Sequence, residues 1–230
     1  MNGFSESLLR MTLDIPREGE RATFQKGPLS LHIESHRGGL CVRTAHGNDL
    51  PNDQDADPRT PPKRHFLGLP QDGCLELAVR APDYRVRVHL TDRLTVVPGG
   101  RLRGYLTVPL PHRLSWRRPD GRTDALLEVA PKELRTAWLG EGALGGYIHD
   151  THSAFHIDRR GLRADTVALI PVVIINHSDH VLSPEVLTIS IRDRDIQELD
   201  GQIITSPRRL HFGEEAQFHE RIRSIPRRSA

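Results

Sequence analysis

The chain has 230 residues, of which 37% are hydrophobic and 27% charged, so it is long enough and apolar enough to bury a sizeable core. Its 32 basic and 30 acidic residues leave a formal net charge of +2, which excludes a globally basic binder of nucleic acid or anionic membranes. Cys41 and Cys74 are too few for a disulfide framework, so the expected compartment is a reducing cytoplasm.

The amino-terminal residues lack the apolar core of a signal peptide. The longest apolar run contains Pro171 and is far shorter than the ~20 residues that cross a bilayer. We therefore expect no membrane insertion.

Short runs of alternating apolar and polar residues, separated by turn signals, predict a succession of β-strands. The runs in the first part of the chain are 9–15, 21–25, 29–34 and 40–44, and Leu29, Leu31 and Ile33 form one apolar face. Further runs are 74–80, 84–90, 94–97, 102–110, 112–118, 125–129, 147–157 and 202–205. The Asp120-Gly121 pair predicts a tight hairpin between two of them.

Residues 46–64 differ from these runs because they contain four prolines and several aspartates but almost nothing to bury. They predict an exposed, partly disordered loop inside a β domain. Two other stretches are ambiguous: 131–139 and 208–225 each suit either a short helix or extended structure.

Two strongly β-branched runs, 167–175 and 186–191, organise the last third of the chain. We expect the first to be a central buried strand that pairs antiparallel with the second, with 176–184 as the exposed connection. The core positions of the two runs are then Val172, Ile174, Leu187 and Ile189. Because proline cannot donate a ladder hydrogen bond, Pro171 predicts a bulge or a strand start.

These patterns predict an all-β protein: an antiparallel β-sandwich in two packed sandwich-like halves, with at most one or two short helices. The expected domains are an N-terminal β domain at 1–111, interrupted by the loop at 46–64, and a C-terminal β-sandwich domain at 112–230.

Several local features between residues 90 and 212 follow a known order. They are Thr107-Val108-Pro109-Leu110, then Leu126-Leu127-Glu128-Val129, then Leu139-Gly140 with Gly146-Tyr147-Ile148, and finally Val172, Ile174, Asn176, Ser178 and Val181. In this order the chain resembles DUF432, an uncharacterised prokaryotic all-β domain family. The resemblance implies an all-β fold and brings no catalytic residues.

Histidine is the one enriched residue type with chemistry to offer. The candidate metal ligands are His149, His152, His156, His177 and His180. Imidazole is a usual ligand of zinc, iron and copper, and neighbouring strands can bring such ligands together. Along one strand residues 149 and 152 face opposite sides, whereas 152 and 156 share a side. The alternative is a cluster of exposed polar positions that binds no metal.

An arginine-rich hairpin offers a second candidate site, for an acidic partner such as nucleic acid. Its members are Trp116, Arg117 and Arg118, where an aromatic ring and cations stand together. The alternative is an ordinary hairpin whose arginines face water.

Assembled catalytic motifs are missing. Gly140, Gly142 and Gly145 have the spacing of the dinucleotide-binding motif Gly-x-Gly-x-x-Gly. No helix is expected to follow them, although this motif requires one. We therefore predict a non-enzymatic protein without a cofactor that binds a protein partner or copies of itself. The first alternative is a His-ligated metalloenzyme with a transition metal, and the second is a binder of nucleic acid or another acidic partner.

Overall fold

The structure is a computed structural model, and it describes residues 7–46, 64–69, 72–140, 145–162, 167–213 and 218–222. Within these ranges the regular structure is β, apart from one short 3-10 helix at Asp193–Asp195. The predicted all-β, sandwich-like class is therefore confirmed. The chain divides into two compact units: unit 1 comprises residues 1–79 and 111–132, and unit 2 comprises residues 80–110 and 133–230.

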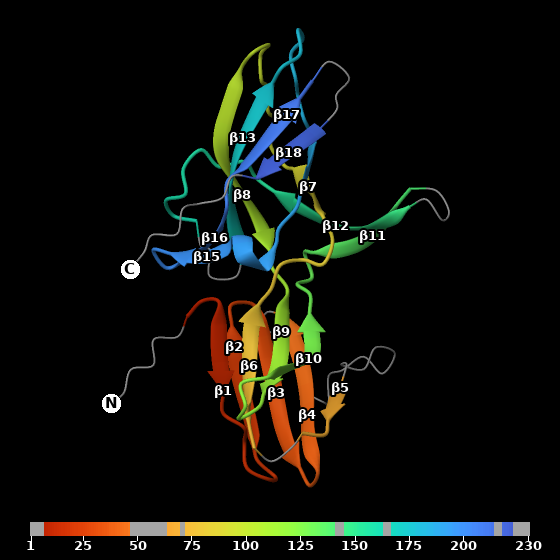
Figure 1. The fold of residues 1–230 in the computed structure, drawn as a ribbon, viewed down its shortest axis with the longest axis vertical. Helices are drawn as coiled ribbons and strands as arrows, with labels where there is room; N and C mark the ends of the chain where they lie inside the picture. Colours follow the sequence, from red (N-terminus) through yellow and green to blue (C-terminus); the bar gives the residue numbers. More distant parts are fainter. Residues whose placement is uncertain are drawn as a thin grey trace. The chain divides into compact units, whose positions relative to one another are not determined.

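Unit 1 contains two four-stranded antiparallel sheets (Figure 1). The first sheet has the order β1-β6-β9-β10, with β1 at Arg10–Leu13, β6 at Cys74–Val79, β9 at His112–Arg117 and β10 at Thr123–Val129. The second has the order β2-β3-β4-β5, with β2 at Arg21–Lys26, β3 at Leu29–His36, β4 at Gly39–His46 and β5 at Arg64–Leu67.

The core of unit 1 lies between these two sheets. Leu29, Leu31 and Ile33 of β3 are buried, as their alternation predicts, and they share one hydrophobic cluster with residues of the first sheet such as Leu77 and Leu114. Because alternate side chains of a strand point to opposite faces, one face of each sheet supplies this core. The predicted hairpin is also present: Gly121, with a φ of 83°, allows the tight turn between β9 and β10.

Unit 2 contains a four-stranded mixed sheet and a six-stranded mixed sheet. The four-stranded sheet has the order β11-β12-β7-β14, with β11 at Arg135–Leu139, β12 at Gly146–Ser153, β7 at Val86–Leu90 and β14 at Val186–Ile189. The six-stranded sheet contains β8 at Arg101–Pro109, β13 at Val167–Asn176, β15 at Ile196–Leu199, β16 at Gln202–Thr205, β17 at Arg208–Phe212 and β18 at Phe218–Ile222.

Strand β13 is central and buried, as predicted, but its expected partner is wrong. It pairs antiparallel with β8 and parallel with β16 and β17, whereas β14 pairs with β7 in the other sheet. A tight hairpin loop would have kept the two runs side by side, but the longer connection leaves each free to join a different sheet. The four predicted core positions are nevertheless buried: Val172, Ile174, Leu187 and Ile189 are at most 1% exposed.

The connection after β13 is held by the buried side chain of Asn176. Its Nδ2 donates to the carbonyl oxygens of Val96 and His180, and its Oδ1 accepts from the backbone N–H and the hydroxyl of Ser178. These bonds satisfy the buried amide and direct the chain away from β13.

Pro171 lies within a continuous strand, so the predicted bulge or strand start is wrong. In the β8 register Pro171 stands opposite Tyr105, whose N–H and C=O bond instead to His156 on the far side. The pair is therefore not hydrogen-bonded, and the missing N–H of Pro171 faces the other flank of β13. On that flank the partner changes from β16, paired at Leu169, to β17, which begins at Val172. Proline is tolerated where the ladder is already interrupted.

Neither ambiguous stretch forms a helix where it is described, and most of the described residues are in strands. Residues 135–139 form β11, and residues 208–212 and 218–222 form β17 and β18. Pairing with neighbouring strands has overridden the weak local preference for helix.

The two units do not follow the predicted boundary between residues 111 and 112. The β9–β10 hairpin pairs with β6 in unit 1, whereas β7 and β8 pair with β12 and β13 in unit 2. Residues 47–63 of the predicted loop lie outside the described residues, as do residues 141–144 of the glycine-rich stretch.

Candidate functional site

A polar cleft in unit 2 brings several titratable side chains together. The cleft has a volume of about 530 Å³ and lies where β7 and β12 end and β14 begins. Its titratable lining residues are His89, Asp92, Arg93, His152 and Glu185. A volume of this size suits a small ligand or a hydrated ion.

The strand register explains why these side chains meet. Strands β7 and β12 run parallel, with Arg87 aligned to Asp150 and His89 aligned to His152. Val86 and Val88 of β7 point into the core, so the alternate residues Arg87 and His89 must face the other side of the sheet. The same alternation places Asp150 and His152 on that side.

Asp150 is the centre of a hydrogen-bonded group beside the cleft. Arg87 binds it in a bidentate manner, with Nε 2.5 Å from Oδ1 and Nη2 2.8 Å from Oδ2. His89 Nε2 lies 3.2 Å from Oδ1. The hydrogen bond from Arg87 is the main cause of the lowered pKa of Asp150. The hydrogen bond from His89 also lowers this pKa, whereas burial raises it. An ionised carboxylate can only accept, so His89 Nε2 is the donor in this hydrogen bond.

We expect the stabilisation that Asp150 provides to be lost in acid. Because the folded-state pKa is lowered, the contribution is complete above the unfolded-state pKa of about 3.9 and disappears as the pH falls through the folded-state pKa. Unfolding free energies of the wild type and Asp150→Asn, measured from neutral pH to pH ~3, should converge as the pH falls. A difference that stays constant over this range would contradict an ionised Asp150 in the folded state.

His152 is the one predicted metal candidate in the cleft, and its ring lies against His89, with centroids 5.2 Å apart. His149 is on the opposite face, as predicted, where its Nδ1 is 3.2 Å from Thr136 Oγ1. His156 follows the end of β12 and forms a backbone bridge with Tyr105. His177 pairs with His211, and His180 contacts Asp179.

Four of the five predicted histidines therefore have separate surroundings. Across the described ranges, no three His, Cys, Asp or Glu side chains are grouped so that they could hold a metal ion. Metal binding by this chain stays a prediction. Of the five candidate histidines, His152 is the one whose ring lies against another histidine of the four-stranded sheet, His89.

The predicted arginine-rich site lies on the β9–β10 hairpin of unit 1, but its aromatic member is buried. Trp116 is only 2% exposed and belongs to the core between the two sheets. Arg117 and Arg118 are exposed, and Arg118 Nε is 2.7 Å from Asp124 Oδ2. A buried ring cannot stack on a base, so the hairpin offers surface arginines alone.

Comparison with protein families gives one match, to the family described as "protein of unknown function (DUF432)", over residues 12–226. The chain belongs to the DUF432 family. The match covers both units of the DUF432 chain, which is more than the region in which the sequence resembled the family. Comparisons with curated proteins and with solved structures gave no significant match. No helix in the described part of the DUF432 chain is long and apolar enough to span a membrane.

The DUF432 chain carries exposed aromatic residues that the sequence analysis did not select. We call Tyr84, Trp138 and Tyr147 the aromatic surface; they are 42%, 49% and 57% exposed. The Tyr147 ring lies 5.1 Å from Trp138, edge to face, and 5.5 Å from Tyr84. Trp138 and Tyr147 stand opposite each other in the β11–β12 register. Only the pairing of the two strands brings these rings together.

The aromatic surface lies at an edge of its sheet with which no other described strand pairs. Strand β11 pairs with β12 on one flank, and it is the edge strand of the β11-β12-β7-β14 sheet. Figure 1 shows β11 and the beginning of β12 extending away from the other strands of unit 2. An edge strand presents backbone N–H and C=O groups that can pair with another chain.

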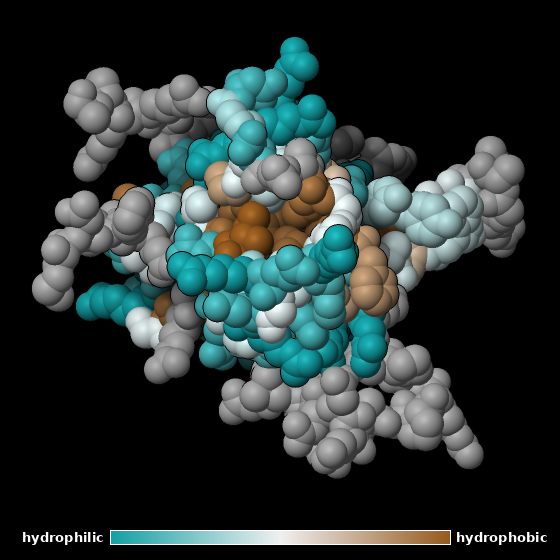
Figure 2. Space-filling view, turned by 90° about the horizontal axis from the view of Figure 1, so that it is seen from below, coloured by the Kyte–Doolittle hydropathy of each residue, from teal (hydrophilic) through white to brown (hydrophobic). Residues whose placement is uncertain are grey.

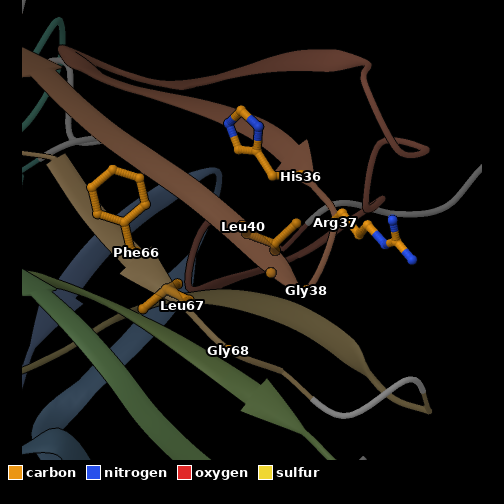
Figure 3. A pocket seen from close by; sticks show the side chains of 8 residues that line it. His36, Arg37, Gly38, Leu40, Phe66, Leu67 and Gly68 are labelled. Carbon is orange, nitrogen blue, oxygen red and sulfur yellow. The ribbon is translucent and has the colours of Figure 1, made fainter.

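Two further concave features of the DUF432 chain involve apolar residues. A cavity of about 290 Å³ in unit 1 is lined by the turn between β3 and β4 and by β5, with Leu40, Phe66 and Leu67 among its side chains (Figure 3). On the face drawn in Figure 2, hydrophobic residues lie in a hollow that hydrophilic residues surround. The lining of the cavity includes none of the predicted site residues.

Proposed function

We propose that this protein is a non-enzymatic binding protein that recognises a protein partner, a second copy of the chain included, through the aromatic surface. The observation that carries the proposal is the position of exposed Trp138 and Tyr147 on the edge of a sheet. Tryptophan and tyrosine dominate the binding energy of protein interfaces, because they bury much area and lose little conformational freedom.

The edge strand β11 adds a second means of recognition. A strand from a partner can pair with the flank that no described strand occupies, so that backbone hydrogen bonds give affinity and side-chain contacts give specificity. The aromatic rings then supply the apolar contact beside the new strand. Contiguous exposed rings on a monomer are typical of such interaction sites, whereas single exposed apolar residues are ordinary.

We expect Trp138→Ala to abolish or strongly weaken association, because truncating a central aromatic residue of an interface typically costs at least about 2 kcal/mol in binding. Self-association is measured by size-exclusion chromatography with light scattering over a range of concentrations, and partner capture by an unbiased pull-down. Phe66→Ala is the matched control, because Phe66 is an exposed aromatic residue, 75% accessible, in the other unit.

A protein that stays monomeric, captures no partner and turns over a small molecule would refute the proposal. So would equal loss of association in Trp138→Ala and Phe66→Ala.

Nucleic-acid binding through the β9–β10 hairpin has little support, since Trp116 is buried and cannot stack on a base. Binding to phosphates through Arg117 and Arg118 would have to weaken steeply with salt. Titration of the protein with oligonucleotides at several salt concentrations tests this alternative directly.

A further inference from the structure

The outer face of the six-stranded sheet in unit 2 carries a group of basic side chains. On the inner face Val172, Ile174 and Leu210 are at most 1% exposed, so the alternate residues of β8, β13 and β17 face outward. His177 directly follows β13 and contacts β17 through His211. We call the basic residues of this side the basic face: Arg101, Arg103, His177, Arg209 and His211.

The strand register sets these residues in rows. Each row crosses β8, β13 and β17 and places an apolar residue of β13 between two basic ones, as Arg103–Val173–Arg209 and Arg101–Ile175–His211 (Figure 1). Neighbouring strands lie about 4.8 Å apart, and alternate residues of one strand are about 6.7 Å apart. The cations therefore stand at regular intervals on both sides of an apolar strip.

The arginines of the basic face are not neutralised by the part of the chain that the structure describes. Arg87 and Arg208 of the same unit each bind an aspartate. In contrast, Arg101, Arg103 and Arg209 are exposed, and their guanidinium groups make no ion pair or hydrogen bond with another described residue. Such a local group of cations attracts anions, although the formal net charge of the chain is only +2.

His177 and His211 add a flat surface to the basic face. His177 Nε2 is 2.8 Å from His211 Nδ1, whereas the ring centroids are 5.1 Å apart, with 3° between the planes. Parallel rings whose nitrogens are so much closer than their centres lie edge to edge in one plane, joined by a hydrogen bond. His177 is exposed, so this plate is accessible to a planar ring of a ligand. Nucleobases stack on histidine and other aromatic side chains.

We propose that the basic face binds single-stranded nucleic acid, with phosphates on Arg101, Arg103 and Arg209 and a base on the plate of His177 and His211. Arginine holds phosphate oxygens through two parallel N–H donors. Cations that follow the backbone, combined with a stacking surface, are the means by which proteins bind single strands without sequence preference. The basic face and the aromatic surface belong to different sheets of unit 2, so this binding does not depend on the proposed protein binding.

The plate favours a single strand over other polyanions. An acidic protein segment would contact the arginines alone, because carboxylates do not stack. A duplex presents its phosphates but keeps the faces of its bases stacked inside, whereas the bases of a single strand can be splayed onto a protein surface. A single strand is therefore the partner that uses both the cations and the plate.

Fluorescence anisotropy of labelled oligothymidylate and oligouridylate tests the proposal on the full chain, at several salt concentrations and at pH ~8, where imidazole is ordinarily uncharged. We expect binding that weakens with salt, with a slope of log affinity against log salt of about −0.7 for each phosphate contact. Arg103→Ala and Arg209→Ala should each make this slope shallower by about 0.7. His177→Ala should weaken binding by at least about fivefold without changing the slope, because only stacking is lost.

Three variants serve as controls. Arg209→Lys keeps the charge and should keep the slope of the wild type. Arg117→Ala combined with Arg118→Ala removes two exposed arginines of unit 1 and should not change binding. Trp138→Ala should also bind the oligonucleotides as the wild type does, whether or not it loses a protein partner. Thermal unfolding shows whether each variant is folded, and the exposed arginines should be replaceable with little loss of stability.

The inference is overturned if the wild type binds neither oligonucleotide at low salt, or if the substitutions at Arg103, Arg209 and His177 leave affinity and slope unchanged. Loss of binding in the double variant at Arg117 and Arg118 would overturn it as well. Competition distinguishes the classes of partner. If polyglutamate or a DNA duplex displaces the labelled strand as effectively as unlabelled oligothymidylate does, the plate has no role and the basic face does not select single strands.

Discussion

Replacing Arg208 with alanine is expected to lower the unfolding free energy of unit 2 by about 3–5 kcal/mol, because it leaves a buried charge without its partner. Arg208 is fully buried at the start of β17. Its Nη2 is 3.0 Å from Asp195 Oδ2 and 2.9 Å from the Ser190 carbonyl oxygen, and its Nη1 is 2.7 Å from the Ser206 carbonyl oxygen. Alanine would leave the 6% exposed Asp195 and two carbonyl groups without these donors.

Native-state hydrogen exchange of β13 and β17 amides measures this loss within unit 2, where a single two-state transition of a two-unit chain cannot be assumed. Arg209→Ala is the matched control: this neighbouring side chain is exposed, so its loss should change stability by less than about 0.5 kcal/mol. A loss below about 1 kcal/mol for Arg208→Ala, the value of a surface ion pair, would contradict the buried network.

The double substitution Arg208→Met with Asp195→Leu separates the cost of an unpaired charge from the value of the pair. Apolar side chains of similar volume often replace a buried ion pair without loss. We therefore expect the double variant to recover much of the stability that Arg208→Ala loses. A double variant that is as unstable as the single one would mean that hydrogen bonds to Ser190 and Ser206 dominate.

Replacing Ile174 with alanine is expected to cost about 2–5 kcal/mol, as large-to-small changes in a core do. Ile174 is 0% exposed in β13, where Leu102 of β8 and Leu210 of β17 flank it in register. Both neighbours restrict how far the strand can move to fill the space. Hydrogen exchange of the β13 amides again gives the loss in unfolding free energy for unit 2.

Ile157→Ala is the control for this change, since Ile157 is 83% exposed and the same atoms are removed. It should cost less than about 0.5 kcal/mol. His177→Ala should also cost little, because its ring lies at the surface. If amides 172–175 exchange among the fastest in the wild type, the assignment of β13 as the buried centre of its sheet is wrong.

The candidate sites could be predicted from the sequence only in part. Arg87 with His89 and Asp150 with His152 are each two residues apart, so each pair was bound to share a strand face. The two pairs lie side by side only because β7 and β12 pair in parallel, which brings together residues 63 positions apart in the chain. Local alternation carries no information on that pairing. The exposure of Trp138 and the burial of Trp116 were likewise decided by whether a second sheet covers the strand.

The sequence by itself determined those strands whose apolar and polar residues alternate clearly, and the faces of these strands. Period-two alternation is a property of a few consecutive residues, so Leu29, Leu31 and Ile33 could be placed in a core without knowing any partner. The Asp120-Gly121 turn was equally local, because glycine adopts without strain the positive φ that it has there.

Only the tertiary structure decided which strands pair. Strands β13 and β14 follow each other in the chain, yet they belong to different sheets and pair with β8 and β7. Backbone hydrogen bonding is the same for every strand, so pairing follows from which edges and apolar faces can be buried together, over long separations in sequence. Pro171 shows the same dependence: it fits inside β13 because neither β16 nor β17 pairs with its position on the flank that its nitrogen faces.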